Sequence, residues 1–131
     1  MSNVNTVAPH KYPLWVTVLG AVVFASLLYS LIFVPKYFVA SKELKIGQEA
    51  YKNRQYTEAI KNYEAVLVKI PSSQEAKISL AEVYFTKGQP ADIEKGESYL
   101  KGLILDKSDV QRLAKAIPEK YKKNLDKFYI I

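Results

Sequence analysis

A stretch of apolar residues near the amino terminus constrains this chain more than any other feature of its sequence. No charged side chain occurs between Lys11 and Lys36, and residues 14–34 read LWVTVLGAVVFASLLYSLIFV. As a helix that rises about 1.5 Å per residue, this run is about 30 Å long, which matches the hydrocarbon core of a bilayer. The sequence therefore predicts a transmembrane helix over residues 14–34, preceded by a short tail over residues 1–13.

The residues that flank the apolar run favour the same structure. Pro13 is suited to a helix start and Pro35 to a helix stop. The alternative is a cleaved signal peptide, whose apolar stretch is normally shorter and ends at small residues. Here the only pair of small residues that could form a cleavage site is Ala40-Ser41, and the bulky Phe38 just before it makes this a poor site. Aromatic side chains suited to the two membrane interfaces are Tyr12, Trp15, Tyr37 and Phe38.

Charges beside the apolar run bear on its orientation. The amino-terminal side carries Lys11 and the terminal amine, whereas the other side carries Lys36, Lys42 and Lys45. Because cytoplasmic flanks hold the excess of basic residues, the carboxy-terminal part leans toward the cytoplasm. The margin is small, and the opposite orientation stays open.

Small residues recur along one stripe of the apolar run. Such a stripe allows close approach of a second transmembrane helix, although small residues are also common in membrane helices generally. The candidate packing residues are Thr17, Gly20, Ala21 and Ala25.

After a connector over residues 35–41, the chain shows apolar residues at helical spacing and no convincing strand pattern. We predict an all-α fold, with two helical hairpins over residues 42–107 and an amphipathic capping helix over residues 108–131 that Pro118 kinks or restarts. Glu97 and Lys101 are spaced for an ion pair within one helix. The expected helix-start signals are Thr57, Ser72 with Glu75, Asp92, and Ser108 with Gln111, and the expected end signal is Gly88.

Residues 46–71, IGQEAYKNRQYTEAIKNYEAVLVKIP, resemble the tetratricopeptide repeat, a helical hairpin with a 34-residue period. Gly47, Tyr56, Ala59, Tyr63 and Pro71 occupy the family's small, aromatic and proline positions. A second unit is similar over Leu80, Ala81, Tyr84 and Gly88. It then departs from the pattern, because two extra residues enter the turn, Tyr99 takes the aromatic place and the closing proline is missing.

The resemblance implies a role in protein binding. In the family, the inner helices of the hairpins line a concave groove. Members that clamp a terminal carboxylate carry Lys and Asn there, and this chain departs from that pattern, so we reject the specialised role. A mixed apolar and polar groove suits a helix or an extended segment of another protein. Carried over by position, the groove residues are Leu44, Gln48, Tyr51, Lys52, Ile78, Glu82 and Phe85.

The sequence lacks the motifs of catalysis and of cofactor binding. It holds no cysteine, and its one histidine is His10 in the amino-terminal tail. Neither a phosphate-binding loop nor a dinucleotide fingerprint occurs, so residues 103–106 (LILD) read as the buried face of a helix rather than as a nucleotide-site strand. We predict no enzyme activity, no cofactor, no metal and no small-molecule substrate.

The chain has a net charge of +6, and its densest cluster of basic residues lies near the carboxy terminus. A basic helix with aromatic residues can lie on anionic lipid or contact RNA, although such lysines more often form the solvent-exposed face of a packed helix. A membrane tether favours lipid over nucleic acid. The residues concerned are Lys120, Lys122, Lys123 and Lys127, interleaved with Tyr121, Phe128 and Tyr129.

Two functions of different kinds fit these observations. The first is a membrane-anchored adaptor or scaffold that binds another protein through its repeat surface. The alternative is an accessory subunit of an integral membrane complex, held through its transmembrane helix and stabilising assembly. In both, the partners are protein and membrane lipid, with no nucleic acid.

Overall fold

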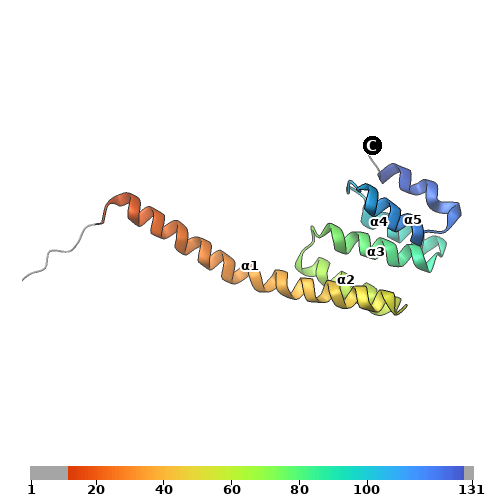
Figure 1. The fold of residues 1–131 in the computed structure, drawn as a ribbon, viewed down its shortest axis with the longest axis horizontal. Helices are drawn as coiled ribbons and strands as arrows, with labels where there is room; N and C mark the ends of the chain where they lie inside the picture. The colour runs from red at the N-terminus through yellow and green to blue at the C-terminus, as the bar shows by residue number, and fades with distance from the viewer. Residues whose placement is uncertain (1–11, 129–131) are drawn as a thin grey trace, which may run out of the picture. The chain divides into compact units, whose positions relative to one another are not determined.

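The computed structural model describes residues 12–128, and this part of the chain is helical, with no β-strand (Figure 1). The chain divides into two compact units, one ending at Pro35 and one beginning at Lys36, and the first helix contributes to both. The all-α prediction is therefore confirmed. The elements are α1 (Leu14–Lys52), α2 (Tyr56–Lys69), α3 (Gln74–Lys87), α4 (Pro90–Leu100), α5 (Lys107–Ala116) and a 3-10 helix, η1 (Glu119–Phe128).

The part of α1 that belongs to the first unit is long and apolar enough to cross a membrane. None of its most apolar 18-residue window is buried within the described chain. Its Ser and Thr hydroxyls donate hydrogen bonds to carbonyls of the same helix at 2.7–3.0 Å, from Thr17, Ser26 and Ser30. These three hydroxyls therefore do not need water as a partner.

The helix end predicted at Pro35 is wrong. Helix α1 runs through this proline to Lys52, so the predicted connector over residues 35–41 is helical. A proline inside a helix removes one backbone hydrogen bond and crowds the preceding turn. Ending the helix there would instead have left four carbonyl groups without an intrahelical partner.

The first hairpin of the second unit pairs the end of α1 with α2. A Cβ atom on Gly47 would lie 2.6 Å from the ring of Tyr63, so the two helices touch at a position that only glycine fits. Ala50 and Ala59 are buried beside this contact. Glu43 and Lys69 form an ion pair at 2.9 Å across the same hairpin. The small residues at these positions thus let the two helices pack closely.

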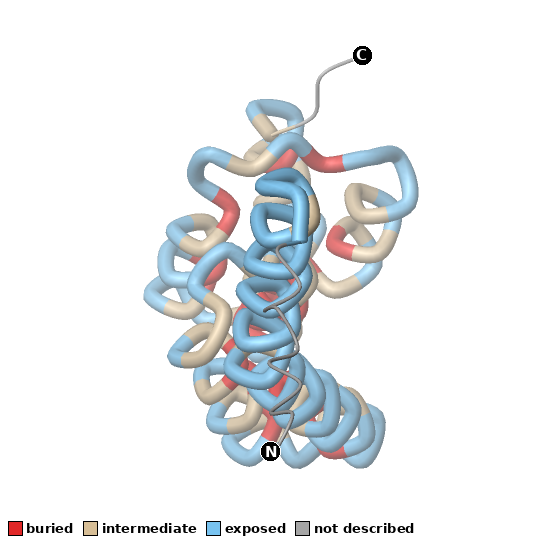
Figure 2. Tube along the Cα trace, turned by 90° about the vertical axis from the view of Figure 1, so that its left-hand side faces the viewer, coloured by how far each residue is buried: buried red, intermediate tan, exposed pale blue. Residues whose placement is uncertain are grey.

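Helix α3 lies at the centre of the second unit and packs against α2, α4 and α5. Eight of its residues are buried, on several sides of the helix, and Figure 2 marks the buried positions along the chain. Its partner α4 comes close at Gly96, where a Cβ atom would lie 2.6 Å from the ring of Phe85. A helix that is covered on several sides has few positions left for a binding surface.

The helix ends confirm one predicted cap and move two others. Gly88 ends α3 in the left-handed conformation (φ 73°), and its N–H donates to the carbonyl of Tyr84 at 3.3 Å. The cap of α3 is Ser73 rather than Ser72, since the Ser73 hydroxyl accepts a hydrogen bond from the Ala76 N–H at 3.3 Å. Helix α2 begins at Tyr56, before Thr57, without a side-chain cap. Ser72 and Ser73 carry the same cap-forming hydroxyl, so the packing of α3 decides which of them is the cap.

The predicted starts of α4 and α5 are also wrong. Helix α4 begins at Pro90, a favoured first helical residue. Asp92 lies in its first turn and pairs with Lys87 at 3.0 Å. Helix α5 is capped by Asp106, which accepts from the Asp109 N–H at 2.8 Å and from the Ser108 hydroxyl at 2.7 Å. Both bonds go to Oδ1 of Asp106, since one carboxylate oxygen can accept two hydrogen bonds.

The carboxy-terminal segment differs from the predicted single helix. Gly102 adopts φ 78°, and residues 103–106 are not helical, contrary to the interpretation of LILD as a helix face. Leu105 is buried, and its N–H donates to the Phe128 carbonyl at 3.4 Å. The restart predicted at Pro118 is confirmed, because α5 ends at Ala116 and η1 follows. The predicted cap over residues 108–131 is therefore two elements, with residues 129–131 outside the described chain.

Candidate protein-binding groove

Side chains from α1, α3 and α5, with Tyr63 of α2, line two adjoining hollows on the second unit. The first has a volume of about 360 Å³ and is lined by Tyr51, Glu82, Thr86, Ser108, Gln111, Arg112, Lys115 and Ala116. The second has a volume of about 280 Å³ and is lined by Gln48, Tyr51, Lys52, Tyr63, Glu82 and Arg112. Because the hollows share three residues, we treat them as one groove, defined by these two sets.

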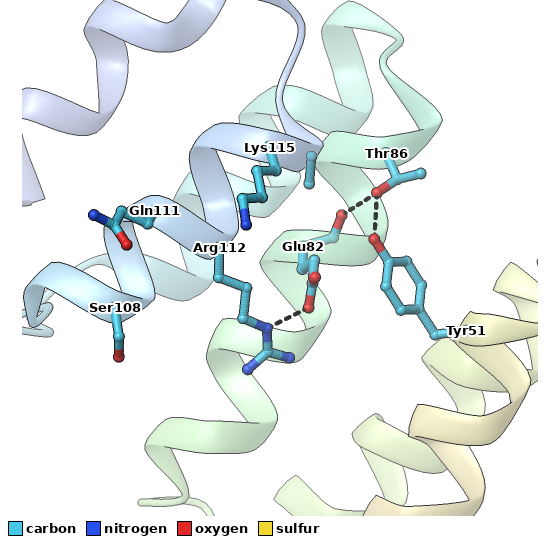
Figure 3. Close-up of a pocket in the computed structure, with 8 residues that line it drawn as sticks. Tyr51, Glu82, Thr86, Ser108, Gln111, Arg112 and Lys115 are labelled. Atoms are coloured by element: carbon cyan, nitrogen blue, oxygen red, sulfur yellow. Dashed lines mark hydrogen bonds and ion pairs between the residues drawn. The ribbon is translucent and has the colours of Figure 1, made fainter.

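Arg112 organises the floor of the groove by bridging α5 to α3. Its Nε donates to Glu82 Oε2 at 2.6 Å, its Nη1 to Glu75 Oε1 at 2.8 Å and its Nη2 to the hydroxyl of buried Ser79 at 2.9 Å. Figure 3 shows Arg112 reaching from α5 to Glu82 on α3. A planar guanidinium with several donors suits such a three-way contact. These bonds hold the two walls of the groove together.

Tyr51 links the α1 wall to α3 in a similar way. Its hydroxyl lies 2.9 Å from Thr86 Oγ1, and the Thr86 hydroxyl donates to the Glu82 carbonyl at 2.8 Å (Figure 3). Since Thr86 has a single hydroxyl hydrogen, Tyr51 is the donor in the first bond. The aromatic ring is thereby held in place at the boundary between the two hollows.

Burial and charge act against each other at the centre of the groove. Burial raises the pKa of Glu82 above its ordinary value, and the neighbouring Arg112 offsets this only in part. Burial also opposes the charged form of Arg112, but its hydrogen bond to Glu75 and the charges of Glu82 and Glu75 outweigh burial and raise the pKa of Arg112. Arg112 therefore stays charged across the physiological pH range.

The structure brings four of the seven predicted binding residues into the groove, namely Gln48, Tyr51, Lys52 and Glu82. Leu44 is half-buried and packs against the core clusters instead. Placing Ile78 and Phe85 on the binding surface was wrong. Both are buried, at 4% and 0% exposure, in the core that joins α3 to α4 and α5. Residues of α4, α5 and η1 share this cluster with them, and the Phe85 ring lies directly against Gly96 of α4.

Sequence reasoning missed the contribution of α5 to the groove. Ser108, Gln111, Arg112 and Lys115 all line it from this helix. The available signal was the amphipathic pattern of residues 107–117, in which Leu113 and Ile117 are buried and these polar residues occupy other positions. Assigning the segment to a cap left its polar side unused in the prediction.

The remaining predicted features lie outside the groove. Thr17, Gly20, Ala21 and Ala25 are all exposed on the first unit, and a Cβ atom on Gly20 would meet nothing within 4 Å. Their role in packing stays a prediction. His10 and Tyr129 lie outside the described residues. Over residues 12–128, no group of three or more His, Cys, Asp or Glu side chains is placed to hold a metal ion.

The carboxy-terminal basic cluster is partly engaged within the chain. Lys127 pairs with Glu97 at 2.7 Å, and Lys122 pairs with Glu119. Glu97 also accepts from Asn124, so its predicted pair with Lys101 does not form. Glu97 instead ties η1 to α4. Two of the four clustered lysines are thus committed to the fold.

Comparisons of the chain with known protein-family models, with curated proteins and with solved structures find no match.

Proposed function

We propose that this protein is a single-pass, membrane-anchored adaptor that binds a segment of another protein in the groove. The observation that carries the proposal is the groove itself, in which three helices present aromatic, amide and charged groups around the Arg112 bridge. Such a mixed surface offers both apolar contact and hydrogen bonding to an extended or helical segment.

Equivalent small residues support a tetratricopeptide-like arrangement of the helices. Gly47 in α1 and Ala81 in α3 are 34 residues apart, and both are buried. Ala59 in α2 and Gly96 in α4 are likewise buried where each helix meets its hairpin partner. In such an array α1, α3 and α5 are the inner helices, and they supply every groove residue except Tyr63 of α2.

The apolar part of α1 supports the anchor. Its side chains are exposed almost without exception, and none of its most apolar window is covered by the described chain. A core helix of a soluble protein would be mostly buried. We propose that lipid covers this segment, with the second unit on the cytoplasmic side as the flanking lysines favour.

We propose a binding role rather than catalysis because the groove lacks a thiol, an imidazole and a carboxylate free of Arg112. Both carboxylates at its centre are engaged by Arg112, and the chain has no cysteine and only one histidine, outside the described residues. A general acid or base needs a titrating group within reach of a substrate.

Photocrosslinking from defined positions tests the groove. A photoreactive amino acid at Gln48 or Gln111 in the groove, compared with Lys61 or Glu94 on exposed faces of α2 and α4, is activated in intact cells. We expect discrete protein adducts from the groove positions only. Adducts of the same size and yield from all four positions, or none from the groove, would contradict the proposal.

Replacement of residues 14–34 by an unrelated membrane helix separates the two functions. An adaptor keeps its groove adducts after the exchange, because any anchor suffices. An accessory subunit held through its own membrane helix loses assembly while its second unit stays folded. Protease accessibility in sealed vesicles reports which side the second unit faces.

A further inference from the structure

The charges of the groove specify the kind of segment it accepts. Four charged residues line it, of which Lys52, Arg112 and Lys115 are basic and Glu82 is acidic. Glu75 adds a second carboxylate through its bond to Arg112. The sum over these five groups is three positive and two negative charges, or +1.

The pairing of these charges matters more than their sum. Both carboxylates are bonded to the single guanidinium of Arg112, and the Glu82 side chain is only 13% exposed. Lys52 and Lys115, in contrast, are exposed and make no ion pair within the part of the chain that the structure describes. Glu75, whose side chain is 42% exposed, lines neither hollow. Among the residues that line the groove, the charges without an ion pair are therefore both positive, Lys52 on α1 and Lys115 on α5.

Hydrogen-bonding groups without partners lie next to the two lysines. The side-chain amides of Gln48 and Gln111 make no hydrogen bond within residues 12–128. Each amide carries donors and an acceptor that match a peptide backbone. The ring of Tyr51, between the hollows, provides apolar contact.

We propose that the groove binds an acidic protein segment, with side-chain carboxylates of the segment placed against Lys52 and Lys115 and its backbone against Gln48 and Gln111. This inference rests on the proposed function, and it names the partner's chemistry. A protein segment is favoured over a lipid surface because the open lysines come from different helices, Lys52 at one hollow and Lys115 at the adjoining one, rather than from one helix face. Complementary charge of this kind sets partner choice and the rate of encounter.

Binding of a model acidic peptide to the full-length chain in detergent micelles tests the proposal. The probe is a fluorescein-labelled decapeptide of alternating Glu and Ala with blocked ends, and its matched control has Gln in place of every Glu. We expect saturable binding of the Glu peptide that weakens as salt is raised, and at least tenfold weaker binding of the Gln peptide. Equal binding of the two peptides, or no binding of either, overturns the proposal.

Paired substitutions locate the binding to the groove. Lys52→Gln with Lys115→Gln should weaken Glu-peptide binding about tenfold, since two exposed ion pairs are lost. Lys61→Gln with Lys101→Gln removes the same charge from exposed positions outside the groove and should change binding less than twofold. Equal loss in both variants would mean non-specific attraction and would overturn the proposal.

Two further readouts separate this inference from its foundations. Groove adducts that persist unchanged in the Lys52→Gln, Lys115→Gln variant refute the acidic segment but leave the adaptor function standing, whereas absent adducts refute the adaptor itself. Titration of the full chain in neutral detergent micelles with glycerophosphoserine, the headgroup of phosphatidylserine, tests the lipid alternative. Saturable headgroup binding that the Lys52→Gln, Lys115→Gln pair abolishes, with no peptide binding, would replace the proposal by a lipid surface.

Discussion

The turn between α1 and α2 places Arg54 in the left-handed conformation, with φ 60°. The Arg54 N–H donates to the Tyr51 carbonyl and the Gln55 N–H to the Ala50 carbonyl, both at 2.9 Å. This pair of bonds is the Schellman arrangement, in which the left-handed residue is usually glycine. Because a side chain in this conformation crowds its own carbonyl, Arg54 lowers the stability of the hairpin.

Replacing Arg54 by glycine should therefore stabilise the second unit. We expect Arg54→Gly to raise the free energy of unfolding by about 0.5–1 kcal/mol, since the gain at the turn exceeds the extra freedom of glycine in the unfolded chain. Thermal unfolding of the full chain in detergent, followed by circular dichroism, measures the change. Arg54→Ala removes the same charge but keeps a Cβ atom, so an equal gain from alanine would contradict the explanation.

Tyr63 carries a prediction about alkaline pH. Burial raises its pKa to about 12 from an ordinary value of 10.0, and the side chain is 1% exposed. Its contribution to stability is complete below pH 10 and is lost as the pH rises toward 12, because the unfolded chain ionises first. By pH 12 the loss reaches about 2 kcal/mol.

The variant Tyr63→Phe should lose less stability between pH 10 and pH 12 than the natural chain. Tyr51 and Tyr99, whose pKa values burial also raises, contribute equally to both proteins and cancel in the difference. Unfolding free energies measured at several pH values give the two slopes. Parallel slopes would mean that the Tyr63 hydroxyl is as accessible as in the unfolded chain.

At the scale of the elements, the fold depends on helix pairs that meet at glycines. The contact of Gly47 with Tyr63 joins α1 to α2, and that of Gly96 with Phe85 joins α4 to α3. Both rings are buried, at 1% and 0% exposure, so neither can swing away from an added methyl group. These contacts set how closely the helices of each hairpin approach.

Gly47→Ala should destabilise the first hairpin even though alanine is the better helix former. Overpacking costs about 1–3 kcal/mol. This cost equals or exceeds the gain of about 1 kcal/mol in helix propensity from glycine to alanine. The cost should shrink when Tyr63 is replaced by Leu, and a double-mutant cycle measures this coupling. A cost that is the same in both backgrounds would locate the strain elsewhere than at the Tyr63 ring.

At the scale of the whole molecule, the carboxy-terminal elements belong to the main core. One cluster of buried residues draws Phe85 from α3, Leu100 from α4, Leu113 from α5 and Leu125 from η1. The Arg112 bridge and the bonds of Glu97 to Asn124 and Lys127 add polar links between the same elements. The end of the chain therefore closes the core and completes the groove.

Leu125→Ala should accordingly destabilise the second unit as a whole. Truncating a buried leucine costs about 2–5 kcal/mol, and we expect one cooperative unfolding transition that shifts to lower temperature. Lys123→Ala, an exposed neighbour on η1, should change stability by less than about 0.5 kcal/mol. Loss of helical signal from η1 alone, with the main transition unmoved, would show that η1 is not part of the core.

Local patterns in the sequence were enough to predict the helices and the apolar segment. The charge-free run, the spacing of apolar residues and the turn at Gly88 depend on residues within a few positions of one another, so they can be recognised without the fold. The passage of α1 through Pro35 and the exact caps at Ser73 and Asp106 were not predictable in the same way, because neighbouring residues offered nearly equal alternatives.

Three of the seven predicted groove residues were misplaced because their positions depend on tertiary contacts that the sequence does not display. The tetratricopeptide resemblance placed Gln48, Tyr51, Lys52 and Glu82 in the groove, but the packing of α4 and α5 on α3 buried Ile78 and Phe85, and α5 brought in Arg112. The bonds of Arg112 to Glu75, Ser79 and Glu82 join residues 30 to 37 positions apart. By itself the sequence determined that the chain is helical and carries one long apolar segment, since helical periodicity and hydropathy are local properties. Only the tertiary structure decided which polar side chains share a groove, since that depends on how closely distant helices pack.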